Sequence, residues 1–319
     1  MTKSPPGNIA ASVRARLLKL ARENGEDFQF SLTRYANERL LFRIAQSPYR
    51  THFILKGASL FTVWTGAPHR ATRDLDLLGL GDTGARHIRQ VFSEILTLAV
   101  PDDGIRFDLN TLAVSSIREE QDFDGVRVRV FATLAAARIR LQIDVGFGDA
   151  VTPEPVSIHF PGLLDFPGPQ LLAYQRETAI AEKFEAIVKL GMANSRMKDF
   201  YDIRVLARDF DFDGEVLASA IRATFHARLI PIPTRLPVAL TSAFAEDATK
   251  KTQWSGFVRK AGVRDTGLLV DTVAAVAAFL EEPMAAAAQD ISFRAVWHAP
   301  GPWDRQGFDR AAEPGGRRR

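Results

Sequence analysis

Two segments of alternating character, residues 126–132 and 138–145, constrain the fold of this chain most strongly. In the second, Ile139, Leu141, Ile143 and Val145 are apolar, and polar side chains occupy the positions between them. Such a period of two is typical of a β-strand that buries one face and leaves the other polar. Because only a short polar and alanine-rich stretch separates the segments, they predict an antiparallel hairpin over a hydrophobic core.

The elements around this hairpin predict a mixed α/β (α+β) chain of two domains. Apolar spacing indicates helices over 8–24, 32–46 and 85–99, with short strands over 52–56 and 72–78 in the same half. After a proline-rich stretch the pattern changes to helices over 171–190, 198–208, 215–225 and 268–280. We therefore expect a sheet domain with N-terminal helices over 1–165, a mainly helical domain over 166–298 and a disordered tail over 299–319.

Composition excludes several classes of protein. The 319 residues contain no cysteine, which excludes disulfides, thiol nucleophiles, iron–sulfur clusters and cysteine-ligated zinc. The six histidines form no closely spaced pair, so a metal would be held by carboxylates. No apolar run reaches the roughly 18 residues of a membrane span, and no signal segment follows the start, so we expect a cytoplasmic protein without a membrane partner.

Three aspartates form the strongest candidate site. Asp74 and Asp76 are two residues apart in a predicted strand and therefore share one face, and Asp144 lies on the polar face of the hairpin. If the strands are neighbours, the three carboxylates converge and suit Mg²⁺ or Mn²⁺, which bind oxygen ligands together with substrate phosphates. The alternative is that these residues are the solvated face of an amphipathic strand.

A turn of small residues precedes these aspartates. The predicted strand over 52–56 ends in Lys56-Gly57-Ala58-Ser59, and a helix follows. Small residues let a phosphate approach the backbone closely, and backbone N–H groups at a helix start favour an anion. The strand, turn and helix thus predict a phosphate site.

The residues from the turn to the second aspartate resemble a known motif. Gly57-Ala-Ser59 followed by Arg70-x-Thr72-x-Asp74-x-Asp76 is similar to the first motif of the minimal nucleotidyltransferases, in particular of the AbiEii/AbiGii toxin family, which includes the MenT toxins. Two later stretches, 181–186 around Lys183 and 196–203 around Asp199 and Asp202, resemble the next motifs of that family in the same order.

The resemblance implies a nucleotidyltransferase-type mixed sheet followed by a helical domain, with the nucleotide in a cleft between them. It implies that Asp74, Asp76 and Asp144 bind metal, that Lys183 contacts the triphosphate, and that Asp199 or Asp202 completes the catalytic site. The implied nucleotide-binding residues are Lys56, Gly57, Ser59, Arg70, Thr72, Lys183 and Lys198. The alternative for Lys183, Lys198, Asp199 and Asp202 is ordinary pairing or a solvated helix face.

The implied activity is Mg²⁺-dependent transfer of a nucleoside monophosphate from an NTP to a hydroxyl of RNA, with a tRNA 3′ end as the expected acceptor. The implied biology is that of a toxin in a toxin–antitoxin or abortive-infection system, neutralised by an antitoxin protein. Alternatives are a transferase of the same fold that modifies a protein or a small molecule, a phosphoryl transferase, and a non-catalytic nucleotide- or RNA-binding module.

Two further patterns leave alternatives open. Residues 79–84 fit the Gly-x-Gly-x-x-Gly pattern of a dinucleotide site, although Asp74 and Asp76 argue against the buried parallel strand that such a site requires. The basic positions Arg14, Arg16, Lys19 and Arg22, with Arg127 and Arg129, fit either RNA backbone contacts or a solvated surface.

Overall fold

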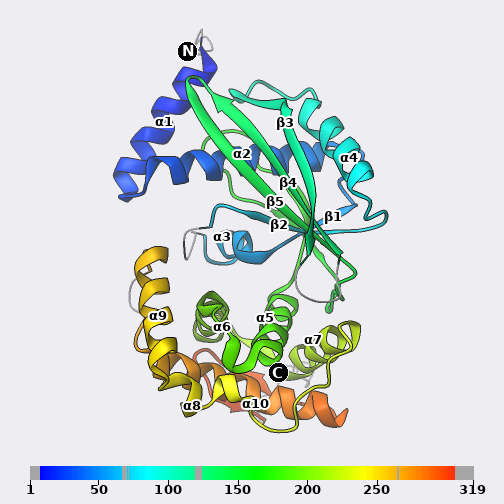
Figure 1. Ribbon diagram of the computed structural model, residues 1–319, viewed down its shortest axis with the longest axis vertical. Coiled ribbons are helices and arrows are strands. Elements are labelled where there is room, and N and C mark those ends of the chain that lie inside the picture. Colours follow the sequence, from blue (N-terminus) through cyan, green and yellow to red (C-terminus); the bar gives the residue numbers. More distant parts are fainter. Residues whose placement is uncertain (1–7, 67–69, 71, 119–123, 264–265, 306–319) are drawn as a thin grey trace, which may run out of the picture. The chain divides into compact units, whose positions relative to one another are not determined.

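The computed structural model describes residues 8–66, 70, 72–118, 124–263 and 266–305. The chain divides into two compact units, one formed by residues 1–148 and 156–174 and the other by residues 149–155 and 175–319 (Figure 1). The main boundary lies after residue 174, not at the expected residue 165, because strand β7 (Gln170–Ala173) pairs in parallel with β1 (Phe53–Lys56) and so belongs to the first unit.

The first unit is built on a seven-stranded mixed sheet in the order β3-β4-β5-β2-β1-β7-β6. Parallel pairs join β2 to β5 and β1 to β7, and every other neighbouring pair is antiparallel. The predicted hairpin is present as β4 and β5, joined by a two-residue turn between Leu134 and Ala137. The remaining bounds are β2 (Leu75–Gly79), β3 (Ile105–Arg118), β4 (Asp124–Leu134), β5 (Ala137–Phe147) and β6 (Val156–His159).

Helices α1 (Ile9–Asn24), α2 (Phe28–Gln46) and α4 (Ala85–Thr97) pack against this sheet, whereas α3 (Leu60–Thr65) is a single short helix after β1. Helix α2 packs on β5 and β7, and Figure 1 shows it crossing behind the long strands. The alternating apolar residues of β5, such as Ile143 and Val145, are fully buried, as expected for a strand with one face in a core.

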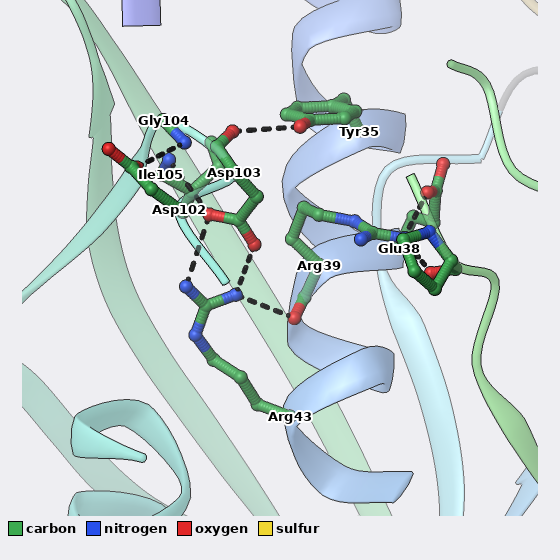
Figure 2. A network of polar contacts seen from close by, with 9 residues as sticks. Tyr35, Glu38, Arg39, Arg43, Asp102, Asp103, Gly104 and Ile105 are labelled. Carbon is green, nitrogen blue, oxygen red and sulfur yellow. Dashed lines mark hydrogen bonds and ion pairs between the residues drawn. The ribbon is translucent and has the colours of Figure 1, made fainter. Parts of the chain in front are cut away.

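Helix α2 also carries a buried network of charged side chains, shown in Figure 2. Arg43 donates two hydrogen bonds, of 2.7 and 3.2 Å, to the carboxylate of Asp103. Tyr35 donates to the carbonyl of Asp103 at 2.8 Å, and Arg39 pairs with Glu38. Burial raises the pKa of Glu38 above its ordinary value, although Arg39 offsets part of this effect. The network fixes α2 to the start of β3, since buried charges require partners.

The second unit is mainly helical. The expected helix over 171–190 begins only at Arg176, because residues 170–173 complete the sheet of the first unit. The α-helices of the second unit are α5 (Arg176–Leu190), α6 (Met197–Asp209), α7 (Gly214–Ala227), α8 (Ser242–Ala245), α9 (Ala248–Ala261) and α10 (Leu269–Gln289). Helix α5 packs on α7, and α10 packs on both α6 and α7. No helix in the described part of the chain has the length and apolar character needed to span a membrane.

Residues 299–305, which were expected to belong to a disordered tail, are structured instead. A small three-stranded sheet joins β8 (Phe212–Asp213), β9 (Val296–Trp297) and β10 (Trp303–Asp304). Trp303 is buried, stacks on Phe279 at 5.7 Å and donates to its carbonyl at 3.0 Å. This aromatic contact provides the burial that composition alone did not indicate, and residues 306–319 lie outside the described residues.

Candidate active site

A row of charged residues crosses four neighbouring strands of the first unit at one level. Lys56 on β1 lies opposite Asp76 on β2, Asp76 lies opposite Asp144 on β5, and Asp144 lies opposite Arg127 on β4. Residues in register on adjacent strands point to the same face of a sheet. These four side chains are partly buried, and their neighbours along each strand form the core.

Asp144 is held by the neighbouring strand. Arg127 donates from Nε and Nη2 to the two carboxylate oxygens of Asp144, each at 2.7 Å. Such a bidentate pair fixes the orientation of the carboxylate as well as its charge. Arg127 therefore belongs to this row, and Arg129 on the same strand lies 3.5 Å from the amide oxygen of Gln142.

Asp74 lies outside the strand that was expected to carry it. Strand β2 begins at Leu75, so Asp74 is an exposed residue directly before it and does not share a strand face with Asp76. Asn37 of α2 donates to the carbonyl of Arg73 at 3.1 Å and Thr72 donates to the carbonyl of Asp74 at 3.4 Å. These hydrogen bonds hold residues 72–74 in place, although these residues lie outside the sheet.

Among the described residues, no three acidic or histidine side chains are grouped so as to hold a metal ion by themselves. Asp76 and Asp144 nevertheless supply two adjacent carboxylates. Mg²⁺ commonly binds through one or two carboxylates and completes its coordination with water and substrate phosphates. The chemistry of this donor pair therefore fits a magnesium site that the substrate completes.

Gly57 packs directly against the carboxylate of Asp76. It has φ of +75°, and a Cβ atom at this position would lie 2.1 Å from Oδ2 of Asp76. Only glycine satisfies both the positive φ and this close approach. The turn Gly57–Ser59 is a 3-10 helix, and α3 after it is only six residues long, so the expected contribution of a helix dipole is small here.

Ser59 and Thr72 line one small cavity of about 40 Å³ in the first unit. Asn37 and Thr62 contribute to its walls, and the buried Oδ1 of Asn37 has no hydrogen-bond partner among the described residues. Arg70 is partly buried, and Lys56 lies with its ammonium 5.5 Å from the ring centre of Tyr174. In the first unit, Lys56 and Gly57 thus lie beside Asp76, and Ser59 and Thr72 lie in the wall of the same cavity.

A second cluster of predicted residues lies in the second unit. Lys183 of α5 donates to Asp202 at 2.8 Å and to Asp199 at 3.4 Å, and both carboxylates belong to α6. Arg196 donates to the other oxygen of Asp199 at 2.6 Å. The side chains of Asp199 and Asp202 are 0% exposed, and that of Lys183 is 12% exposed. Helix surface pairing alone does not describe this arrangement, because the carboxylates are buried and the cation that they share, Lys183, comes from another helix.

Lys198 is separate from this cluster. It is exposed at the start of α6 and has no ion-pair partner in the part of the chain that the structure describes. Helix α5 is also fixed on its other side, where Arg228 pairs with Asp149 at 2.8 Å and with Glu185. Burial opposes the charge of Arg228, but the surrounding carboxylates together hold its pKa above the ordinary value.

The glycines of the dinucleotide-like pattern have structural roles. Gly79 ends β2, and a Cβ atom there would lie 2.4 Å from the ring of Phe147. Gly84 is the N-cap of α4 and donates to Asp82 at 2.8 Å. Since β2 is flanked by the antiparallel β1 and not by a doubly wound parallel sheet, this loop lacks the setting of a dinucleotide site.

Two adjacent carboxylates beside a glycine turn on a mixed sheet fit a site for a metal ion and a phosphate. A model of the family described as nucleotidyl transferase AbiEii toxin, type IV toxin–antitoxin system, matches residues 39–281. The chain belongs to this family, and it is a nucleotidyltransferase of the toxin class.

One solved structure agrees with the fold. MenT4, a nucleotidyltransferase toxin from Mycobacterium tuberculosis, is 17% identical, with a TM-score of 0.52 over 87% of this chain and 93% of that one. JHP933 from Helicobacter pylori is 14% identical, with a TM-score of 0.43 over 88% and 95% of the two chains. The comparison with curated protein sequences found no match.

Proposed function

We propose that this protein transfers a nucleoside monophosphate from an NTP to a hydroxyl of RNA, with a tRNA 3′ end as the acceptor. The observation that carries the proposal is the in-register placement of Asp76 and Asp144 beside the Gly57 turn. Membership of the AbiEii family supports the reaction class. In the proposed step the acceptor oxygen forms a bond to the α-phosphorus, the bond to pyrophosphate breaks, and the hydroxyl proton passes to solvent.

Each group of residues has a proposed part in this step. Asp76 and Asp144, with Asp74, would hold Mg²⁺ or Mn²⁺, which supplies charge neutralisation for the phosphates when bound. Gly57 and Ser59 leave room for a phosphate beside Asp76, with Lys56, Arg70 and Thr72 as further nucleotide contacts. Lys183 would bind the triphosphate, and the buried Asp199 and Asp202 would hold its ammonium in position. Lys198 remains a candidate nucleotide contact.

We propose further that the protein acts in the cytoplasm, where NTPs and tRNA are available, and that an antitoxin protein controls it. The family description as a type IV toxin–antitoxin component supports this proposal.

The test is incubation of the purified protein with total cellular RNA, Mg²⁺ and each α-³²P-labelled NTP in turn. We expect label in a tRNA-sized band with the wild type and none with Asp74→Ala, whose thermal unfolding should be unchanged because Asp74 is exposed outside the sheet. Label on the protein itself, or on no acceptor, would contradict the RNA assignment, and retained transfer by Asp74→Ala would contradict the site.

A further inference from the structure

Helix α9 of the second unit has two faces of different character. Its inner face is anchored by Lys250, which is 6% exposed and donates to the carbonyl of Asn194 at 3.0 Å. Trp254 is buried and donates to the carbonyl of Gly267 at 3.3 Å. The ring of Phe257 lies 5.6 Å from that of Tyr201 on α6. The inner face therefore accounts for the packing of the helix.

The outer face carries three exposed cations and no acidic residue. Lys251, Arg259 and Lys260 are exposed, and none has an ion-pair partner within the described ranges of the chain. The helix itself, Ala248–Ala261, contains no Asp or Glu. Asp247 precedes it as the N-cap and accepts from the amide of Lys250 at 3.0 Å. No acidic residue within the helix therefore offsets the positive charge of its outer face.

The residues between these cations are small. Helical spacing places Ser255 between Lys251 and Arg259, and Gly256 between Thr252 and Lys260. A Cβ atom at Gly256 would meet no atom within 4 Å, so this position opens on free space. We define the six residues Lys251, Thr252, Ser255, Gly256, Arg259 and Lys260 as the α9 basic face.

We propose that the α9 basic face binds the sugar–phosphate backbone of the acceptor RNA. The inference rests on the proposed function and adds to it the surface that receives the polymer. Lys251 and Arg259 are eight residues apart, about 12 Å along the helix at roughly 1.5 Å per residue. At this separation the two side chains can meet different phosphates of one strand. Two cations with small residues between them therefore suit phosphates along one strand.

Four of the other basic residues named from the sequence have contacts within the protein. On α1, Arg16 pairs with Asp165, and Lys19 lies 3.7 Å from Glu23. Arg14 lies over the ring of Phe28 at 5.3 Å. Arg127 of β4 is engaged with Asp144. These contacts reduce what each cation offers to a phosphate, whereas α9 retains its charges and packs on α6, which carries Asp199 and Asp202.

The test measures RNA binding separately from catalysis. Fluorescein-labelled unfractionated tRNA is titrated with the full chain, without NTP or divalent metal, and binding is followed by fluorescence anisotropy over a range of salt concentrations. The variant is Lys251→Glu/Arg259→Glu. The matched control is Lys189→Glu/Arg294→Glu, which changes two other exposed cations of the same unit and alters the net charge equally. Circular dichroism during heating checks that both variants fold.

We expect the α9 variant to bind tRNA on the order of tenfold more weakly or worse, and its slope of log Kd against log salt to fall by about 2. The control should retain the wild-type slope. Equal weakening by both variants, or no tRNA binding by the wild type, would overturn the inference. Label transfer to RNA by the wild type in the earlier assay would preserve the proposed function even if the α9 variant bound tRNA normally.

Discussion

Asp76 and Asp144 lie directly opposite each other on two parallel strands that are neighbours in the centre of the sheet. Adjacent strands are separated by roughly 4.8 Å, so the two carboxylates share one small region on one face. Like charges at this spacing repel each other, and Arg127 and Lys56 flank them in the same row. The protein thus maintains two adjacent negative charges in an ordered sheet, which is a suitable setting for a divalent cation.

The first prediction concerns Asp76→Asn. Removing one carboxylate of the pair should lower transfer by roughly 100-fold or more, because loss of residues that merely support metal ligands already costs 10–100-fold. The fold should persist, since the amide has the same shape and relieves a like-charge repulsion. Rates with labelled NTP and binding of Mn²⁺ by calorimetry are the measurements, with Asp209→Asn on α6 as the control. Undiminished Mn²⁺ binding by Asp76→Asn would contradict the assignment.

The second prediction separates backbone strain from contact with the carboxylate. Gly57→Ala and Gly25→Ala both place a methyl group at positive φ, +75° and +64°, but only the first methyl group meets Asp76. Each should cost about 1–2 kcal/mol of stability from the backbone alone. Gly57→Ala should in addition abolish transfer, while Gly25→Ala should retain it. Similar activity in the two variants would show that the approach of Gly57 to Asp76 is unimportant.

The third prediction concerns the buried cluster of the second unit. Lys183→Met would leave Asp199 and Asp202 without their shared cation, although Arg196 still contacts Asp199. Breaking such a buried pair typically costs about 3–5 kcal/mol, so urea unfolding should show a loss of this order. The double variant Lys183→Met/Asp202→Asn should recover part of the stability but none of the activity. Full activity in that double variant would exclude Lys183 from substrate binding.

The fourth prediction concerns pH. Burial raises the pKa of Glu177 above its ordinary value, and the nearby Arg176 offsets only part of this effect. A group with a raised folded-state pKa contributes stability that is present below its unfolded pKa and is lost as pH rises through its folded pKa. Compared with Glu177→Gln, the wild type should therefore lose unfolding free energy as pH rises from about 4 to about 7.

Thermal or urea unfolding at several pH values measures this difference. The exposed Glu23→Gln variant on α1 is measured in parallel as a control for the loss of one carboxyl group. A constant difference for Glu177→Gln would indicate that Glu177 titrates as it does in the unfolded chain.

The fifth prediction concerns the network of Figure 2. Arg43→Met would leave Asp103, which is 2% exposed, without its bidentate partner. We expect a loss of about 3–5 kcal/mol in urea unfolding. Arg222 is only partly buried and its partner Asp290 is exposed, so Arg222→Met, which removes contacts with Glu215 and Asp290, should cost less than about 1 kcal/mol. Equal losses of unfolding free energy in the two variants would show that burial does not increase the contribution of the Arg43–Asp103 pair to stability.

Sequence patterns predicted the β4–β5 hairpin and the mixed fold, because alternation directly reports which face of a strand is buried. They did not reveal that Arg127 faces Asp144. That pairing follows from a two-residue turn at Ala135 and Ala136, where Ala135 adopts φ of +50°. Because these alanines lack the glycine or asparagine that usually marks such a turn, the sequence left the register of the hairpin open.

The cluster around Lys183 was only partly predictable. The spacing of Asp199 and Asp202 indicates one helix face, but their burial against Lys183 depends on how α5 packs on α6. Tertiary packing of this kind leaves no local periodic signal. The family motifs identified the residues, whereas their mutual contacts and the part of Arg196 required the structure.

Buried apolar residues alternate with polar residues along β5, so the carboxylate of Asp144 lies in a strand that resists local opening. Ile143 and Val145 are fully buried on either side of Asp144 in the same strand. Central strands of this kind exchange their amide hydrogens only through large openings, whereas loops and edges open readily. The carboxylate pair is therefore available for as long as the sheet exists, and its geometry is lost only when the molecule unfolds as a whole.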